Sequence, residues 1–191
     1  MVLTVKQQGP DGGLPVIAAV QTAQSLPTSL RPTGHYDRCS VTPLSPEPSR
    51  RLAIVTCMDC RIDLETALGV ELGEAHVLRN AGGVVTDDVI RSLAISQRKL
   101  GTREVLVVHH TRCVMQTITD DGFRAELQQE IGVAPPFAIE AFTDLDDDVR
   151  QSVRRVRRSE FLPHRGRVGG HVYDVDTQEL HEVELPEDAD E

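Results

Sequence analysis

Three residues with metal-binding side chains, Cys57, His110 and Cys113, are the features of this sequence best suited to chemistry. They lie in two short stretches, TCMDCR at 56–61 and HHTRC at 109–113. Two thiolates and an imidazole, with a fourth position left open, are typical of a catalytic zinc site rather than of a structural one. The sequence therefore predicts one Zn²⁺ per chain, bound by these three side chains, if the fold brings them together.

The pattern of apolar residues after Arg51 predicts the fold that must position these side chains. Short apolar runs alternate with stretches of helical periodicity, which indicates a βαβαβ order and a parallel sheet buried on both faces. We expect an α/β fold with a mainly parallel β-sheet flanked by helices and an antiparallel C-terminal strand addition. The predicted strands are 52–55, 75–78, 105–108, 168–175 and 179–185, and the predicted helices are 61–69, 86–100, 120–131 and 146–159.

The ends of two predicted strands carry the candidate ligands. Cys57 follows the first strand and His110 follows the third, and these strands are often neighbours in a doubly wound sheet. Because neighbouring strands lie roughly 4.8 Å apart, ligands at their carboxyl ends can share one ion. Cys113 needs only a turn to join them. His109 should point away from the metal, since successive side chains of a strand alternate between faces.

Composition divides the chain into two regions. Residues 1–50 hold seven of the eleven prolines, which predicts an extended or disordered N-terminal arm, and 51–191 should form one zinc domain. A formal net charge of −10 argues against nucleic acid or an anionic membrane as a partner. No apolar run approaches the roughly 18 residues of a membrane span. We therefore expect a cytoplasmic protein that acts on a small molecule.

The spacing Cys-x-Asp-x-Arg at 57–61, followed by His-x-x-Cys at 110–113, resembles that of the β-class carbonic anhydrases. The similarity covers roughly residues 51–185 and includes Arg-Asn-Ala-Gly at 79–82, which resembles the loop before the family's long active-site helix. This resemblance implies a zinc lyase that interconverts CO₂ and bicarbonate. It also implies a homodimer or a dimer of dimers, with the active-site pocket near the subunit interface.

The same resemblance implies that Asp59 and Arg61 form the catalytic pair beside the zinc. Arg61 is able to hold Asp59 in a bidentate ion pair, which keeps the carboxylate off the metal and directs it at a bound water molecule as an acceptor. Backbone amides around Gly82 and Gly83 are expected to help place the substrate. The alternative for these two glycines is a simple turn.

Two departures from the family pattern favour an alternative activity. Val114 stands where glycine is common, and Arg112 stands where aspartate or another small or polar residue is common. The β-branched valine takes up space beside the metal, and Arg112 either pairs with Asp59, attracts an anion or faces solvent. The alternative is therefore a zinc-binding relative that is catalytically weak or acts on COS or CS₂.

A second alternative comes from Cys60, which completes a CxxC motif with Cys57 between a strand and a helix. That setting is shared with dithiol oxidoreductases of the thioredoxin type. The redox interpretation leaves His110 and Cys113 unexplained. Under the zinc interpretation, Cys60 should be a packed thiol on the first helical turn.

Overall fold

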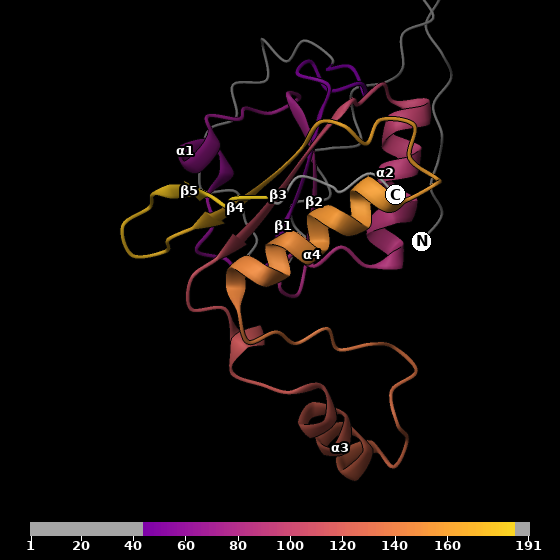
Figure 1. The fold of residues 1–191 in the computed structure, drawn as a ribbon, viewed down its shortest axis with the longest axis vertical. Coiled ribbons are helices and arrows are strands. Elements are labelled where there is room, and N and C mark those ends of the chain that lie inside the picture. Colours follow the sequence, from indigo (N-terminus) through magenta and orange to yellow (C-terminus); the bar gives the residue numbers. More distant parts are fainter. Residues whose placement is uncertain (1–43, 186–191) are drawn as a thin grey trace, which may run out of the picture. The chain divides into compact units, whose positions relative to one another are not determined.

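The computed structural model describes residues 44–185, and Figure 1 shows how they are arranged. Most of the predicted N-terminal arm lies outside this range, so the arm stays a prediction. The described end of the arm runs beside the loop before the second strand. There the Ser49 amide donates to the Gly73 carbonyl and the Arg50 amide donates to the Glu74 carbonyl, both at 3.1 Å.

Five strands form one sheet in the order β2-β1-β3-β4-β5. β1 pairs in parallel with both β2 and β3, and β3 pairs in parallel with β4. Among the strands of the described residues, only β5 runs antiparallel, against β4. The mainly parallel sheet and its antiparallel C-terminal addition are therefore confirmed. The strands are β1 Leu52–Cys57, β2 Ala75–Asn80, β3 Glu104–His110, β4 Val168–Tyr173 and β5 Leu180–Glu182.

The helices begin where polar residues can cap them. Thr86 accepts a hydrogen bond from the Val89 amide at the start of the second helix, and Asp144 caps the last helix in the same way through the Asp147 amide. The first helix is shorter than expected, because Asp63 is its N-cap and residues 59–62 form a turn before it. The helices are α1 Leu64–Leu68, α2 Asp87–Lys99, the 3₁₀ turn η4 Val114–Gln116, α3 Asp120–Ile131 and α4 Leu145–Arg158.

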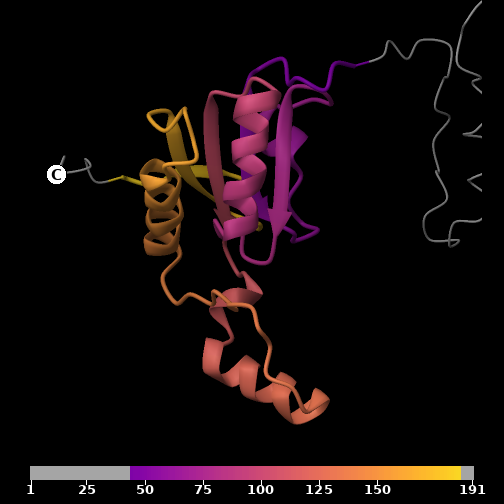
Figure 2. The same ribbon diagram turned by 90° about the vertical axis from the view of Figure 1, so that its right-hand side faces the viewer.

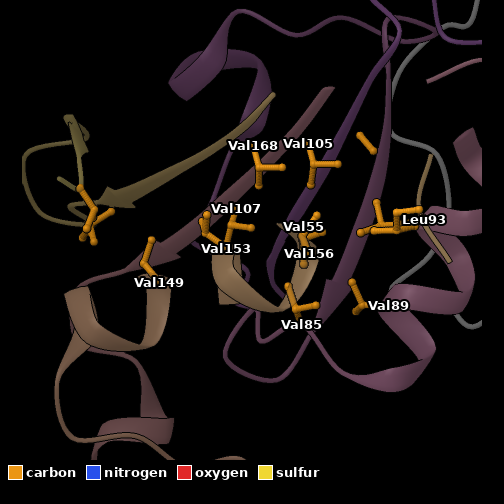
Figure 3. Close-up of a cluster of buried hydrophobic side chains, with 14 residues drawn as sticks. Val55, Val85, Val89, Leu93, Val105, Val107, Val149, Val153, Val156 and Val168 are labelled. Carbon is orange, nitrogen blue, oxygen red and sulfur yellow. The ribbon is translucent and has the colours of Figure 1, made fainter. Parts of the chain in front are cut away.

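Apolar side chains pack on both faces of the sheet. Figure 2 shows that α2 and α4 lie on the same side of it. On that side, valines from the strands pack against the apolar faces of α2 and α4, and Figure 3 shows this cluster, including Val55, Val107, Leu93 and Val153. On the opposite side, a second cluster joins Ile54, the candidate cysteine ligands and α1. The central strands β1 and β3 are buried on both faces, as their continuous apolar runs predicted.

The charges of α4 follow its helix dipole. Asp146, Asp147 and Asp148 occupy its first turn, and Arg155, Arg157 and Arg158 its last. Acids near the positive N-terminal end and bases near the negative C-terminal end each stabilise a helix by roughly 0.3–1 kcal/mol. Among residues 44–185, no helix is both long and apolar enough to cross a membrane.

Candidate metal centre

The three candidate ligands meet at the carboxyl ends of β1 and β3. These strands are neighbours, and Thr56 stands opposite Val108, so Cys57 and His110 leave the sheet at the same edge. Cys113 follows His110 after a short turn. The ligand atoms of the three side chains all lie within 4.8 Å of one another, and all three residues are buried. The predicted gathering of these side chains is present in the structure.

The donor set and its surroundings fit a zinc ion. His110 directs its Nδ1 at the Thr111 carbonyl oxygen, 2.9 Å away, which leaves Nε2 as the free ring nitrogen. That nitrogen is buried and has no hydrogen-bond partner among the described residues. A buried polar atom without a partner is costly, and a metal ion is one partner that removes the cost. Two sulfurs and one such nitrogen are the ligands that zinc prefers.

The electrostatics of the two cysteines favour one thiolate even without a cation. Hydrogen bonding from Cys113 is the largest cause that lowers the pKa of Cys57, to about 4, and the backbone amides of Asp59 and Gly82 act in the same direction. The thiolate at Cys57 in turn raises the pKa of Cys113. Two adjacent sulfurs repel each other as anions, so a divalent cation is what allows both to be thiolates.

Arg61 holds Asp59 beside the cluster through three hydrogen bonds. Its backbone amide and Nε each donate to Oδ1 at 2.9 Å, and Nη2 donates to Oδ2 at 2.7 Å. These bonds keep the pKa of Asp59 well below its usual range. Oδ2 of Asp59 lies 3.8 Å from His110 Nε2, so the carboxylate faces the candidate ligands while bound to the arginine.

Comparison with known proteins places this geometry in a family. Residues 52–159, more than half of the chain, match the family described as carbonic anhydrase. Over 141 residues, the chain is 53% identical to β-carbonic anhydrase 1 of Mycobacterium tuberculosis, a match that covers 74% of this chain and 86% of that protein. The chain belongs to the β-class carbonic anhydrase family. Enzymes of this family are zinc-dependent, which agrees with the donor set.

Two further relatives show the range of activities near this chain. A crystal structure of carbonic anhydrase from Streptococcus mutans superposes with a TM-score of 0.72 at 44% identity, covering 76% of this chain and 88% of that one. A carbon disulfide hydrolase from an Acidianus species is 33% identical over 156 residues, covering 69% of this chain and 76% of that protein. Sequence similarity alone therefore leaves the substrate open between CO₂ and CS₂.

The two residues that depart from the usual carbonic anhydrase pattern lie at the surface. The Arg112 guanidinium pairs with Asp176 rather than with Asp59. Its backbone enters the Asp59 network instead, because the Arg112 carbonyl accepts a hydrogen bond from Arg61 Nη2 at 3.1 Å. Arg112 adopts a φ of 54°, a left-handed conformation that is uncommon for non-glycine residues. Val114 is 58% exposed, so most of its side chain lies in solvent.

Gly82 and Gly83 lie against the candidate ligand Cys57, and both have positive φ, 80° and 76°. A Cβ built on Gly83 would lie 2.8 Å from the Cys57 backbone nitrogen, which is closer than real Cβ atoms approach. A Cβ on Gly82 would crowd Met115 and Phe142 at 3.2 Å. The turn therefore requires glycine for its backbone conformation and for close packing, whatever its part in binding substrate.

Two residues contact the surroundings of the site through partners that the sequence did not predict. Arg79 donates to the carbonyls of Cys57 (3.0 Å) and Ile62 (2.8 Å), and so fixes both ends of the turn that carries Asp59. On the opposite side of β3, buried His109 directs Nε2 at Asp148 Oδ2 of α4, 2.7 Å away. His109 thus points away from the candidate ligands, as strand alternation predicted, but its partner lies 39 residues away in sequence.

The interpretation of Cys60 as a packed thiol was wrong. Cys60 is exposed in the turn before α1, because the helix begins only at Leu64. Cys57, by contrast, is buried with His110 and Cys113. The redox alternative therefore accounts for one member of the cluster and leaves the other two without a role.

Proposed function

We propose that this protein is a zinc-dependent carbonate dehydratase that interconverts CO₂ and bicarbonate. The observation that carries the proposal is the gathering of Cys57, His110 and Cys113 within 4.8 Å, with Asp59 held beside them by Arg61. The 53% identity with a mycobacterial β-carbonic anhydrase supports the choice of substrate. In this proposal the first three residues are the metal ligands, and the last two are the catalytic pair.

Cys57, His110 and Cys113 would hold one zinc ion per chain. Two thiolates and a neutral imidazole balance the charge of Zn²⁺, so the buried centre is formally neutral. When bound, zinc supplies Lewis-acid chemistry that lowers the pKa of a coordinated water molecule from about 15.7 towards 7.

Asp59 and Arg61 would orient the water molecule. An ionised carboxylate only accepts hydrogen bonds, so Asp59 fixes which proton of the water points towards it and which lone pair faces the substrate. The two oxygens of Asp59 each accept from Arg61, and this prevents the carboxylate from turning onto the ligands. Backbone amides of the turn at Gly82 and Gly83 are the proposed contacts for the oxygen of CO₂ or bicarbonate.

Hydrolysis of CS₂ or COS is the second candidate, favoured by the 33% identity with a carbon disulfide hydrolase. Stopped-flow CO₂ hydration, measured beside CS₂ and COS hydrolysis on one zinc-loaded preparation, separates the two. We expect kcat/KM to be at least about tenfold higher for CO₂, since specificity is a ratio of kcat/KM values. The reverse order would assign the protein to the second candidate, and no turnover of any substrate would refute both.

We also propose that the protein is a homodimer or a dimer of dimers, joined along the edge strand β2. Within residues 44–185 this strand pairs only with β1. The groove of about 400 Å³ that it forms with α2 contains Val77 and Ile95, which are 44% and 46% exposed. An unpaired edge with apolar side chains is a template for a second chain. Sedimentation of the full chain tests this, and a monomer at all micromolar concentrations would contradict it. The cytoplasmic location stays a prediction.

A further inference from the structure

The outer surface of α4 carries an unusual concentration of positive charge for a chain with a net charge of −10. Arg150, Arg154 and Arg158 are spaced four residues apart, and we call them the arginine stripe. Because each residue of an α-helix turns by about 100°, successive members are offset by about 40° and climb about 6 Å. The stripe therefore crosses the exposed face of α4 diagonally, from the side of β5 towards the side of α2.

The far end of the arginine stripe enters a hollow of about 490 Å³ between α2 and α4. Arg154, Arg155 and Arg158 line this hollow, and Arg155 pairs with Asp87 of α2 at 2.6 Å. Arg154 and Arg158 are exposed and form no hydrogen bond or ion pair with any residue of the described chain. Ser159 also lines the hollow, and its buried Oγ has no partner within the same part of the chain.

The near end of the arginine stripe lies where the described chain ends. Arg150 Nε donates to the Glu184 carbonyl at 3.0 Å. The side chain of Leu185 packs against the apolar cluster under α4, and it converges with Val149 and Val153 over Gly170. The described chain thus ends beside Arg150, the first arginine of the stripe.

We propose that the arginine stripe is the docking site for the chain's own acidic segment, residues 187–191. Four of these five residues are acidic, in the sequence Glu-Asp-Ala-Asp-Glu. In an extended chain, Asp188 and Asp190 are about 6.6 Å apart, which matches the rise of about 6 Å between Arg154 and Arg158. Arg154 and Arg158 each gain a carboxylate partner, whereas Arg150 already pairs with Asp147 at 2.6 Å.

Tethering makes this contact effective although each ion pair is exposed. A single surface ion pair contributes only about 0–1 kcal/mol. The segment is joined to Leu185 by one residue, however, so its effective concentration at the arginine stripe is in the millimolar range. In this proposal the docked segment stabilises α4. That helix carries Asp148, which bonds to His109 next to the candidate ligand His110.

Zero-length cross-linking of the full chain tests the docking. Replacing Arg154→Lys and Arg158→Lys keeps the positive charges and supplies amines, which a carbodiimide joins only to carboxylates in contact. We expect mass spectrometry to find a bond between a new lysine and an acid of 187–191. An equal mixture of natural-abundance and ¹⁵N-labelled chains should show both ends of the bond in the same chain. At 1 M salt the yield should fall at least about fivefold, because the Debye length there is about 3 Å.

A matched variant makes a negative result informative. Arg91→Lys places an amine next to Asp88, with which Arg91 pairs at 2.8 Å, and it should cross-link to that carboxylate within α2. If this control couples while the new lysines at 154 and 158 do not reach 187–191, the proposal is wrong. Bonds that join labelled to unlabelled chains would also overturn it, because the occupant would then be a second copy.

Discussion

Replacing His110→Ala will release most of the zinc from the purified protein. The side chain is fully buried at the end of β3, and its Nε2 has no other partner in the described chain. Removing an outer-shell partner of a zinc ligand already costs about 10–100-fold in metal affinity, so losing a ligand should cost at least about 100-fold. Zinc per chain, measured by mass spectrometry after dialysis against a weak chelator, checks the result.

The matched control for this prediction is His181→Ala. His181 is exposed on β5, and its Nε2 lies 4.0 Å from a carboxylate oxygen of Glu179. This variant should retain about one zinc ion per chain, as expected for a site that it does not touch. Equal zinc retention by the His110 and His181 variants would remove His110 from the metal centre.

Replacing Asp59→Asn should lower the rate of CO₂ hydration by about 10²–10³-fold and leave the zinc content near one per chain. The amide keeps the size of the side chain but loses the negative charge that accepts from Arg61 and that would accept from the water molecule. The Arg61 hydrogen bonds at 2.7 and 2.9 Å show how firmly the present carboxylate is held. Stopped-flow hydration of the zinc-loaded variant measures the loss.

Asp176→Asn serves as the control, because Asp176 is an exposed aspartate that also pairs with an arginine near the site, Arg112. Its carboxylate does not contact Arg61 or the candidate ligands through any bond in the described chain. We expect less than about a threefold change in rate for this variant, as for a weak surface ion pair. If Asp59→Asn is as active as Asp176→Asn, Asp59 has no part in the reaction.

Local sequence determined most of the secondary structure. Thr86 with the two acids after it specified the start of α2, and the run of acids and then arginines specified α4, because capping and the helix dipole act within one turn. The apolar runs specified β1 and β3 because strands buried on both faces are continuously apolar, whereas the edge strand β2 is only partly buried. The first helix starts later than predicted, since Asp59 and Arg61 bond to each other in a turn before it. The last strand is shorter than the predicted 179–185, because β5 covers only Leu180–Glu182.

Two of the candidate ligands could be placed from the sequence because the ends of their strands could be predicted. Cys57 and His110 end their strands, and the neighbouring positions of β1 and β3 follow from the usual crossover of parallel sheets. The motif spacing then supplied Cys113, Asp59 and Arg61. The family resemblance included Arg79 in the stretch 79–82, but its role was not predicted, because that role depends on reaching the carbonyls of Cys57 and Ile62 across a strand pair.

The tertiary structure alone decided the contacts that join distant segments. The pair between His109 and Asp148 forms because α4 lies across the end of β3, and no periodicity links two residues that are 39 positions apart. The left-handed backbone at Arg112 aims a carbonyl, rather than the charged side chain, at Arg61. Sequence specifies which groups are available and where each element starts, since those depend on neighbours along the chain. The direction in which each side chain or carbonyl points depends on packing, and only the folded chain defines that packing.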